Sequence, residues 1–250
     1  MKKLEALLFD CDGVICETER DGHRVSFNKA FEKEGVDANW DEELYGHLVK
    51  ISGGKERMAH YFSKDTQKYL PKKFTPEYIA QMHKLKTQIF TELCGRLPAR
   101  PGVVRLMREA HAKGLPIFIC STSSEKSVSA IAKSVLGDDF EKVITKIYAG
   151  DIVKAKKPAP DIYILPQREY DINPENCIVV EDTDNGLRAA RAAGMNCLIT
   201  VSVYSVGEEF NGALAVVNCL GDEGNPSLPI AGSIGSNTKI ITLSDLEGLL

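Results

Sequence analysis

Several short runs of consecutive apolar residues end abruptly in polar or acidic residues, and this pattern constrains the fold of the chain most strongly. Continuous rather than alternating hydrophobicity predicts strands that are buried on both faces, as in a parallel sheet. The runs that we expect to form strands are Ala6–Phe9, Leu115–Cys120, Ile178–Val180, Leu198–Val201, Leu214–Val217 and Ile240–Thr242. Helical patterns lie between several of these runs, so we expect a doubly wound α/β core. Gly221–Asn237, rich in Gly, Pro, Ser and Asn, predicts a long surface loop before a final strand and helix.

The stretch from residue 19 to residue 97 has a different character. It is helix-rich, with amphipathic segments at Glu56–Phe62 and Pro76–Leu93, and no run in it resembles a buried strand. We interpret it as a helical insert that follows the first strand. The expected domains are therefore a core of residues 1–18 and 98–250 and an insert of residues 19–97.

The composition is that of an ordinary globular protein. Hydrophobic residues make up 43% of the chain, and the formal net charge is −4, so nothing suggests nucleic acid or an anionic membrane as a partner. No apolar run approaches the ~20 residues that a membrane-spanning helix needs, and the N-terminus lacks the layout of a secretory signal. The seven cysteines contain no C-x-x-C pair, which argues against a disulfide framework or a zinc ribbon. We expect a soluble protein of a reducing compartment, with its cysteines buried as small hydrophobes.

Two carboxylates follow the first apolar run, in the segment Leu8-Phe9-Asp10-Cys11-Asp12-Gly13-Val14. Asp10 and Asp12 project to the same side in extended geometry, and Gly13 permits a tight turn. They lie at the carboxyl edge of the expected sheet, where ligands bind in open α/β folds. Clustered carboxylates suit a hard divalent cation, and Mg²⁺ pairs readily with phosphate oxygens. These residues alone leave an acidic turn or a weak calcium loop open as the alternative.

Three later segments place further polar side chains at strand ends or on stiff loops. Ser121-Thr122-Ser123 follows another apolar run, and its hydroxyls can hold phosphate oxygens or simply cap the next helix. Lys156-Lys157-Pro158-Ala159-Pro160 offers cations on a proline-stiffened loop, where a lysine neutralises a phosphoryl oxygen or remains a solvated surface residue. Glu181-Asp182 ends a further strand, so Asp182 either completes a cation site or begins a helix.

Two acids, a Ser/Thr residue, a lysine and an acid pair, in this order and each at a strand end, resemble the four-part signature of the haloacid-dehalogenase (HAD) superfamily. The match extends across the core, from Asp10 to Asp182. The resemblance implies a HAD-like Rossmannoid core with a parallel sheet. The position of the insert resembles the helical cap of the beta-phosphoglucomutase and phosphoglycolate-phosphatase branch, in which the cap closes over the site and reads the substrate. Glu17-Thr18-Glu19 resembles the D-T-E hinge stretch of that branch, with Glu in place of the first Asp.

The superfamily resemblance also implies a role for each core residue. Asp10 would attack phosphorus and form an aspartyl-phosphate. Asp12 would protonate the departing oxygen and later deprotonate the hydrolytic water. Ser121 and Lys157 would bind the oxygens of the transferring phosphoryl group. The implied cofactor is Mg²⁺, and its implied ligands are the Asp10 carboxylate, the Asp12 backbone carbonyl and Asp182, with Glu181 nearby.

Further stretches resemble the CbbY-type sugar-phosphate phosphatases of photosynthetic and carbon-fixing organisms. They are Asp21-Gly22-His23-Arg24, Leu44-Tyr45-Gly46, Ser52-Gly53-Gly54-Lys55-Glu56-Arg57-Met58 and Cys120-Ser121-Thr122-Ser123-Ser124-Glu125-Lys126. Such enzymes are associated with removing xylulose-1,5-bisphosphate, an inhibitory by-product of Rubisco, and releasing xylulose 5-phosphate. The resemblance therefore implies a role beside the Calvin cycle, in the plastid stroma or the cytoplasm. We expect a monomer whose partner is a small phosphorylated sugar.

A bisphosphate needs a second anion site, which we expect in the cap. The candidate substrate-binding residues are Lys55, Arg57, Arg24, His23 and Tyr45 in the cap, together with Glu17, Thr122 and Ser123. Gly53-Gly54 would let backbone amides approach an oxyanion. The alternatives are that Lys55-Glu56-Arg57 is an ordinary solvated helix start and that His23 is a packed cap residue.

The core motifs leave other activities open. A mutase of the beta-phosphoglucomutase kind shares the nucleophile, the acid, Mg²⁺ and the cap, but returns the phosphoryl group to a second hydroxyl. A phosphoglycolate phosphatase acts on a two-carbon acid that would not need a distal phosphate site. Asp12, Lys157 and the Glu181-Asp182 pair suit metal-assisted phosphoryl transfer, which argues against dehalogenase chemistry. A catalytically silent binding protein would not need both Asp10 and Asp12, and Mg²⁺-dependent release of phosphate from a generic ester distinguishes it from an enzyme.

Overall fold

The computed structural model describes residues 3–51, 53–63, 74–232, 234 and 239–250. The chain divides into two compact units, one of residues 1–17 and 98–250 and the other of residues 18–97. We call the first the core and the second the cap. No helix among the described residues is both long enough and apolar enough to cross a membrane.

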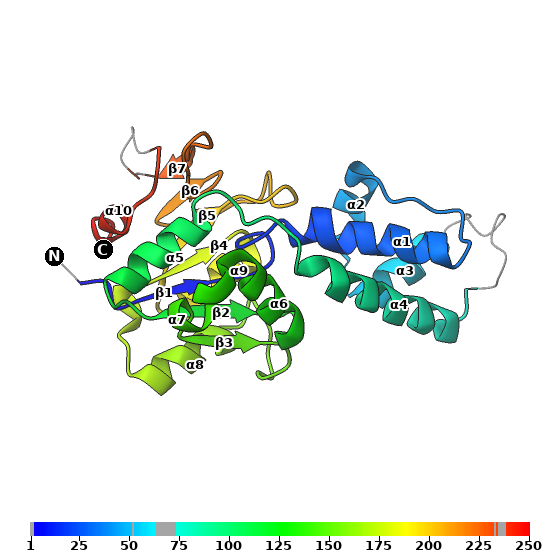
Figure 1. Ribbon diagram of the computed structural model, residues 1–250, viewed down its shortest axis with the longest axis horizontal. Helices are drawn as coiled ribbons and strands as arrows, with labels where there is room; N and C mark the ends of the chain where they lie inside the picture. The colour runs from blue at the N-terminus through cyan, green and yellow to red at the C-terminus, as the bar shows by residue number, and fades with distance from the viewer. Residues whose placement is uncertain (1–2, 52, 64–73, 233, 235–238) are drawn as a thin grey trace. The chain divides into compact units, whose positions relative to one another are not determined.

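The core is built on a seven-stranded sheet with the strand order β3-β2-β1-β4-β5-β6-β7 (Figure 1). The strands are β1 (Ala6–Phe9), β2 (Ile117–Ser121), β3 (Lys146–Ala149), β4 (Cys177–Glu181), β5 (Asn196–Thr200), β6 (Ala215–Val217) and β7 (Pro229–Gly232). All neighbouring pairs from β3 to β6 are parallel, and β7 pairs antiparallel with β6. The predicted α/β class with a parallel sheet is therefore confirmed.

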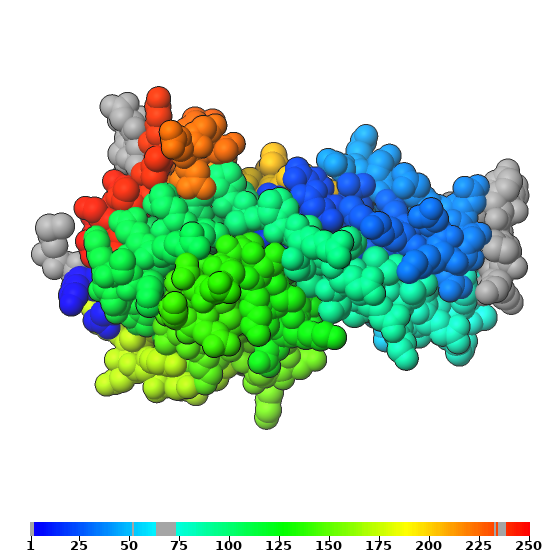
Figure 2. All heavy atoms as spheres, in the orientation of Figure 1, coloured from blue at the N-terminus to red at the C-terminus, as the bar shows by residue number. Residues whose placement is uncertain are grey.

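Helices cover both faces of this sheet, and two of them begin within four residues of the end of a strand (Figure 1). The helices are α5 (Val103–Ala112), α6 (Glu125–Leu136), α7 (Phe140–Val143), α8 (Asp161–Tyr170), α9 (Asp184–Ala192) and α10 (Leu243–Glu247), with short 3₁₀ turns at η3 (Gly137–Asp139) and η4 (Pro174–Asn176). The Ser124 side chain caps α6 by accepting from the Ser127 N–H, and the Thr183 side chain caps α9 by accepting from the Gly186 N–H. The green segments α5, α6 and α7 form much of the face of the core that Figure 2 turns to the viewer.

The alternation of side chains along β1 and β4 determines which face of the sheet each residue joins. Ala6 and Leu8 of β1 belong to one buried cluster with Val179 of β4 and with Tyr163 of α8. A period of two places Asp10 after Ala6 and Leu8, and Glu181 after Val179, on this same face. The sequence periodicity of two strands thus directs two carboxylates toward α8.

The end of the chain departs from the prediction. Ile240–Thr242 forms no strand, although Ile241 is fully buried. Its N–H donates to the Leu220 carbonyl and its carbonyl accepts from Arg105, so side-chain and loop partners satisfy a backbone that the apolar pattern assigns to a sheet. The predicted surface loop Gly221–Asn237 instead contains β7, an exposed strand whose antiparallel pairing with β6 the run's composition does not signal. The final helix is present as α10.

The described part of the cap is helical. Its elements are η1 (Thr18–Arg24, a π-helix), α1 (Val25–Lys33), α2 (Glu42–Leu48), α3 (Gly54–Ser63) and α4 (Pro76–Cys94). α4 begins with a capping side chain from Thr75 and a proline at its first turn, a combination that favours a helix start. Buried aromatic side chains of Phe27, Phe31 and Trp40 pack against one another, with ring centroids 4.7–6.2 Å apart, and form the apolar centre of the unit.

Candidate active site

Lys157 joins the carboxyl ends of three strands. Its Nζ donates to Asp10 Oδ1 at 2.5 Å, to Glu181 Oε1 at 2.6 Å and to the Cys120 carbonyl at 3.0 Å. The three acceptors belong to the segments of β1, β4 and β2, which lie side by side in the sheet. The lysine side chain is 9% exposed, so this loop residue is a buried cation rather than a solvated one. Burial would lower the pKa of Lys157, but the charges of Asp10 and Glu181 outweigh it and raise that pKa.

Three buried carboxylates meet beside this lysine. Asp10, Glu181 and Asp182 each offer an oxygen within 4.8 Å of the others. Burial, and then the charges of Glu181 and Asp12, raise the pKa of Asp10 to about 7 against the opposing effect of Lys157. Burial, and then Glu181 and Asp10, raise the pKa of Asp182 well above its ordinary value. The group thus carries more negative charge than its protein surroundings neutralise.

This set of donors fits Mg²⁺. Hard cations of this size take carboxylate oxygens, and the excess of negative charge is what a divalent ion would neutralise. The backbone of Gly13 passes close to the Asp182 carboxylate. A Cβ at Gly13 would lie 2.1 Å from Asp182 Oδ2, so only glycine leaves room for that carboxylate. Asp10, Asp182 and Glu181 are the side chains that would hold the ion.

Metal-free protein is expected to become less stable as the pH rises through about 7. The folded pKa of Asp10, about 7, lies above its ordinary value of 3.8, so its contribution to stability is present at acidic pH and is lost on the way to neutral pH. Mg²⁺ binds the ionised carboxylates, so it should raise Tm more at about pH 8 than at about pH 5.5. Thermal unfolding with Mg²⁺ or with EDTA at both pH values measures this, and Asp182→Asn should reduce the Mg²⁺ effect. An equal Mg²⁺ effect at the two pH values would contradict this explanation.

Asp12 lies apart from the carboxylate group and contacts hydroxyls of the β2 edge. Its Oδ2 accepts from the Ser123 hydroxyl at 2.5 Å and from the Ser121 hydroxyl at 3.4 Å. The Ser123 N–H in turn donates to Ser121 Oγ at 3.1 Å. Ser121 is fully buried, whereas Thr122 is exposed. The structure therefore brings Asp12, Ser121 and Ser123 together, whereas the Thr122 side chain is exposed.

Glu17 pairs with a residue that the sequence reasoning did not select. Its Oε1 lies 3.2 Å from Arg100 Nε. The Arg100 guanidinium is buried, and it also donates to the carbonyls of Gly13, Thr200 and Val201. Arg100 therefore fixes the turn that carries Asp12, and Glu17 contributes to holding it in place. An arginine beside Pro101-Gly102 has no distinct sequence signal, because it resembles any surface arginine in a linker.

In the cap, Arg57 and Tyr45 bind each other. Arg57 Nη1 donates to the Tyr45 hydroxyl at 2.5 Å, and that hydroxyl donates to Glu19 Oε2 at 2.5 Å. The guanidinium carbon lies 5.0 Å from the Tyr45 ring centroid, and Arg57 Nη2 also donates to the carbonyls of Val49 and Ile51. Arg57 is buried, so it is not part of a solvated helix start. Lys55 and Glu56, by contrast, are exposed.

A second buried cation of the cap is Lys86 of α4, which the sequence reasoning missed. Its Nζ lies 2.6 Å from His23 Nδ1 and 4.6 Å from the Phe27 ring centroid. His23 stacks on Phe90 at 3.8 Å, and burial, with Lys86 and Arg57 next, holds its pKa well below the ordinary value. A neutral His23 therefore accepts from the Lys86 ammonium.

Of the other cap candidates, Arg24 donates to the carbonyls of Arg20 and Trp40, which fixes the local chain. Ser52, part of the Ser52–Met58 stretch, lies outside the described residues. All seven cysteines lie within the described ranges, where each is buried and free, as expected from their apolar surroundings.

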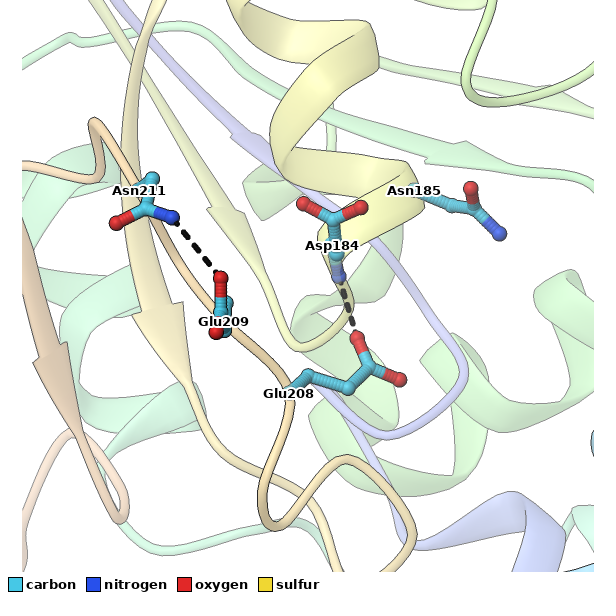
Figure 3. A pocket seen from close by; sticks show the side chains of 5 residues that line it. All are labelled: Asp184, Asn185, Glu208, Glu209 and Asn211. Carbon is cyan, nitrogen blue, oxygen red and sulfur yellow. Dashed lines mark hydrogen bonds between the residues drawn. The ribbon is translucent and has the colours of Figure 1, made fainter.

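The core also has a surface pocket that is unsuited to a phosphate ester. It is lined by Asp184, Asn185, Glu208, Glu209 and Asn211 (Figure 3). Glu208 accepts from the Asp184 N–H at 2.6 Å, and Asn211 donates to Glu209 at 3.3 Å. Three carboxylates with no lysine or arginine in the lining would repel an anion. The group around Lys157 is the better candidate.

Comparison with known proteins identifies the family. The model of the haloacid dehalogenase-like hydrolases matches residues 4–194. The chain belongs to this family. The HAD-like chain is 49% identical to a CBBY-like protein of Arabidopsis thaliana over 222 residues, which is 87% of this chain and 69% of that protein. It is 42% identical to the protein CbbY of Cereibacter sphaeroides over 212 residues, 84% of this chain and 90% of that one.

Solved structures agree with this assignment. CbbY from Rhodobacter sphaeroides, in complex with phosphate, matches with a TM-score of 0.73 and 38% identity, over 86% of this chain and 94% of that chain. A mutant of the same protein, in complex with xylulose-(1,5)bisphosphate, matches with the same values. This HAD-like chain is a hydrolase, and its relatives include proteins named as phosphatases in Bacillus subtilis and Thermotoga maritima. The recognition of a CbbY-type HAD phosphatase from its sequence is confirmed.

Proposed function

We propose that the protein is a Mg²⁺-dependent phosphatase that acts through an aspartyl-phosphate on Asp10 and converts xylulose-1,5-bisphosphate to xylulose 5-phosphate. The observation that carries the chemistry is the Lys157 ammonium, which bridges Asp10 and Glu181 at the carboxyl edge of the sheet. The substrate is supported by the 38% identical CbbY structure that binds xylulose-(1,5)bisphosphate. We propose the plastid stroma or the cytoplasm as the setting and a monomer as the assembly.

The proposed reaction has two steps that share one set of residues. Asp10 attacks phosphorus, while Asp12, which accepts from Ser123, delivers a proton to the departing sugar oxygen. Water then attacks the phosphoryl group on Asp10, and Asp12 takes the proton of that water. Lys157 and Ser121 stabilise the phosphoryl oxygens as charge develops on them. When bound, Mg²⁺ would neutralise the carboxylates and the phosphoryl oxygens, and the Asp12 carbonyl would be a further ligand.

The second phosphate needs cations outside the core, and we propose that the cap supplies them. Lys86 is the strongest candidate because it is buried beside a neutral His23 and over two aromatic rings. Lys55 is exposed and can add charge, whereas Arg57, Tyr45 and Arg24 are held by the cap itself. We therefore propose that Arg57, Tyr45 and Arg24 shape the anion site and do not bind the phosphate themselves. For Glu17 and Thr122 we propose only that they border the substrate.

Lys86→Met is expected to raise KM for xylulose-1,5-bisphosphate by about 10- to 100-fold, because one charge-assisted contact is lost. The value of kcat/KM for p-nitrophenyl phosphate should change by less than about twofold, because this ester has no second phosphate. Lys84→Met, an exposed lysine on the same helix, is the matched control. If Lys86→Met lowers kcat/KM equally for the two substrates, Lys86 has no role in the second anion site.

A substrate panel tests the proposed function. Phosphate release with Mg²⁺ is measured from xylulose-1,5-bisphosphate, ribulose-1,5-bisphosphate, phosphoglycolate, and beta-glucose 1-phosphate with its bisphosphate activator. We expect xylulose-1,5-bisphosphate to have the highest kcat/KM by orders of magnitude and xylulose 5-phosphate to be the sugar product. Isomerisation of glucose 1-phosphate without net phosphate release would instead identify a mutase, and a preference for phosphoglycolate would contradict the bisphosphate assignment.

A further inference from the structure

Tyr163 of α8 contacts both Glu181 and Lys157, although no step of the proposed reaction uses it. Its hydroxyl donates to Glu181 Oε1 at 2.6 Å, the same oxygen that accepts from Lys157. Its ring centroid lies 4.9 Å from Lys157 Nζ. Tyr163 is fully buried, so both contacts are shielded from water.

The protein holds Glu181 through both of its carboxylate oxygens. Oε1 accepts two hydrogen bonds, which uses both of its lone pairs, and Oε2 accepts from the Asp182 N–H at 3.1 Å. A Cβ at Gly186 would lie 1.9–2.1 Å from the Glu181 carboxylate, so the helix backbone packs directly against it. One lone pair of Oε2 remains for a metal ion, and the orientation of the carboxylate is fixed.

Lys157 depends on this fixed carboxylate. An ammonium has three N–H donors, and all three have acceptors, on Asp10, Glu181 and Cys120. If Glu181 rotated, Lys157 would have to follow it or lose a hydrogen bond. The loop and the helix that carry Lys157 and Tyr163 are continuous, because α8 starts four residues after the lysine.

We propose that Tyr163 is a positioning residue, which fixes Glu181 and thereby holds the Lys157 ammonium against Asp10 for the transition state. The inference rests on the role of Lys157 in the proposed function, and it is independent of which phosphate ester is the natural substrate. If Tyr163 acts by positioning for the transition state, loss of its hydroxyl should lower kcat and leave substrate binding unchanged.

The test compares Tyr163→Phe with Tyr148→Phe. Tyr148 is a matched control, because it lies in the same buried cluster and its hydroxyl also donates to a carboxylate, that of Glu169 at 2.8 Å. With Mg²⁺ and p-nitrophenyl phosphate, Tyr163→Phe should lower kcat about tenfold and change KM by less than about twofold. Orthovanadate adopts the geometry of the transition state, so its inhibition constant for Tyr163→Phe should rise about tenfold. The inhibition constant of inorganic phosphate should change by less than about twofold. Tyr148→Phe should leave all four values at the wild-type level.

Two results would overturn the inference. One is a kcat for Tyr163→Phe equal to that of Tyr148→Phe. The other is an equal weakening of vanadate and phosphate inhibition, which would mean that Tyr163 supports ground-state binding alone. A wild-type enzyme that cleaves p-nitrophenyl phosphate and ignores xylulose-1,5-bisphosphate would contradict the proposed substrate and leave the role of Tyr163 in place.

Discussion

Asp10→Asn is expected to lower kcat for phosphate release by at least about 10⁴-fold, because the amide cannot attack phosphorus and no neighbouring group replaces it. The same substitution should not destabilise metal-free protein at neutral pH. Asp10 is 7% exposed in a group of like charges, and an amide of the same shape relieves their repulsion. Loss of activity with an equal or higher Tm is therefore the expected pair of results.

Steady-state rates and thermal unfolding of purified Asp10→Asn measure both effects. Asp184→Asn is the matched control, because Asp184 lies at the start of α9, outside the carboxylate group. Retention of wild-type activity by Asp10→Asn would refute the nucleophile assignment. A large fall in its Tm would refute the claim that Asp10 is held under repulsion.

Lys157→Met is expected to lower kcat/KM by about 10²- to 10³-fold, because the positive charge that stabilises the developing charge on the phosphoryl oxygens is lost. It should also destabilise the metal-free fold, because Asp10 and Glu181 would keep their burial and lose their shared cation. Mg²⁺ should restore part of that stability. The adjacent Lys156 provides a close control, since its side chain is 51% exposed and pairs with Asp151 at the surface.

Activity and Tm of Lys157→Met and Lys156→Met, each with and without Mg²⁺, measure these effects. Equal behaviour of the two variants would mean that the buried lysine contributes neither charge stabilisation nor structure. A loss of activity in Lys157→Met with no change in Tm would confine its role to the transition state.

The central strands and the polar residues at their ends could be predicted from the sequence. β1, β2, β4, β5 and β6 are buried on both faces, so their runs are uninterrupted, and short polar segments follow them directly. β3 and β7 were missed because they lie at the edges of the sheet and are partly or wholly exposed. α8 was missed because Pro166 lies inside it and interrupts the helical pattern.

Residues that act through burial were harder to predict than residues in motifs. Lys86 lies in an amphipathic helix, where a lysine is normally solvated, and only the packing of Phe27 and Phe90 around it makes it a buried cation. Tyr163 resembles any core tyrosine until Glu181 is placed beside it. Their environments are created by segments that are distant in the sequence, so no local pattern marks them.

The most direct test of the central claim is to trap the phosphorylated enzyme during turnover of xylulose-1,5-bisphosphate with Mg²⁺. Rapid acid quenching followed by borohydride reduction converts an aspartyl-phosphate to homoserine, which peptide mass spectrometry locates. We predict homoserine at position 10 in the wild-type enzyme and none in Asp10→Asn. Turnover without modification of Asp10, or modification at a different carboxylate, would contradict the mechanism.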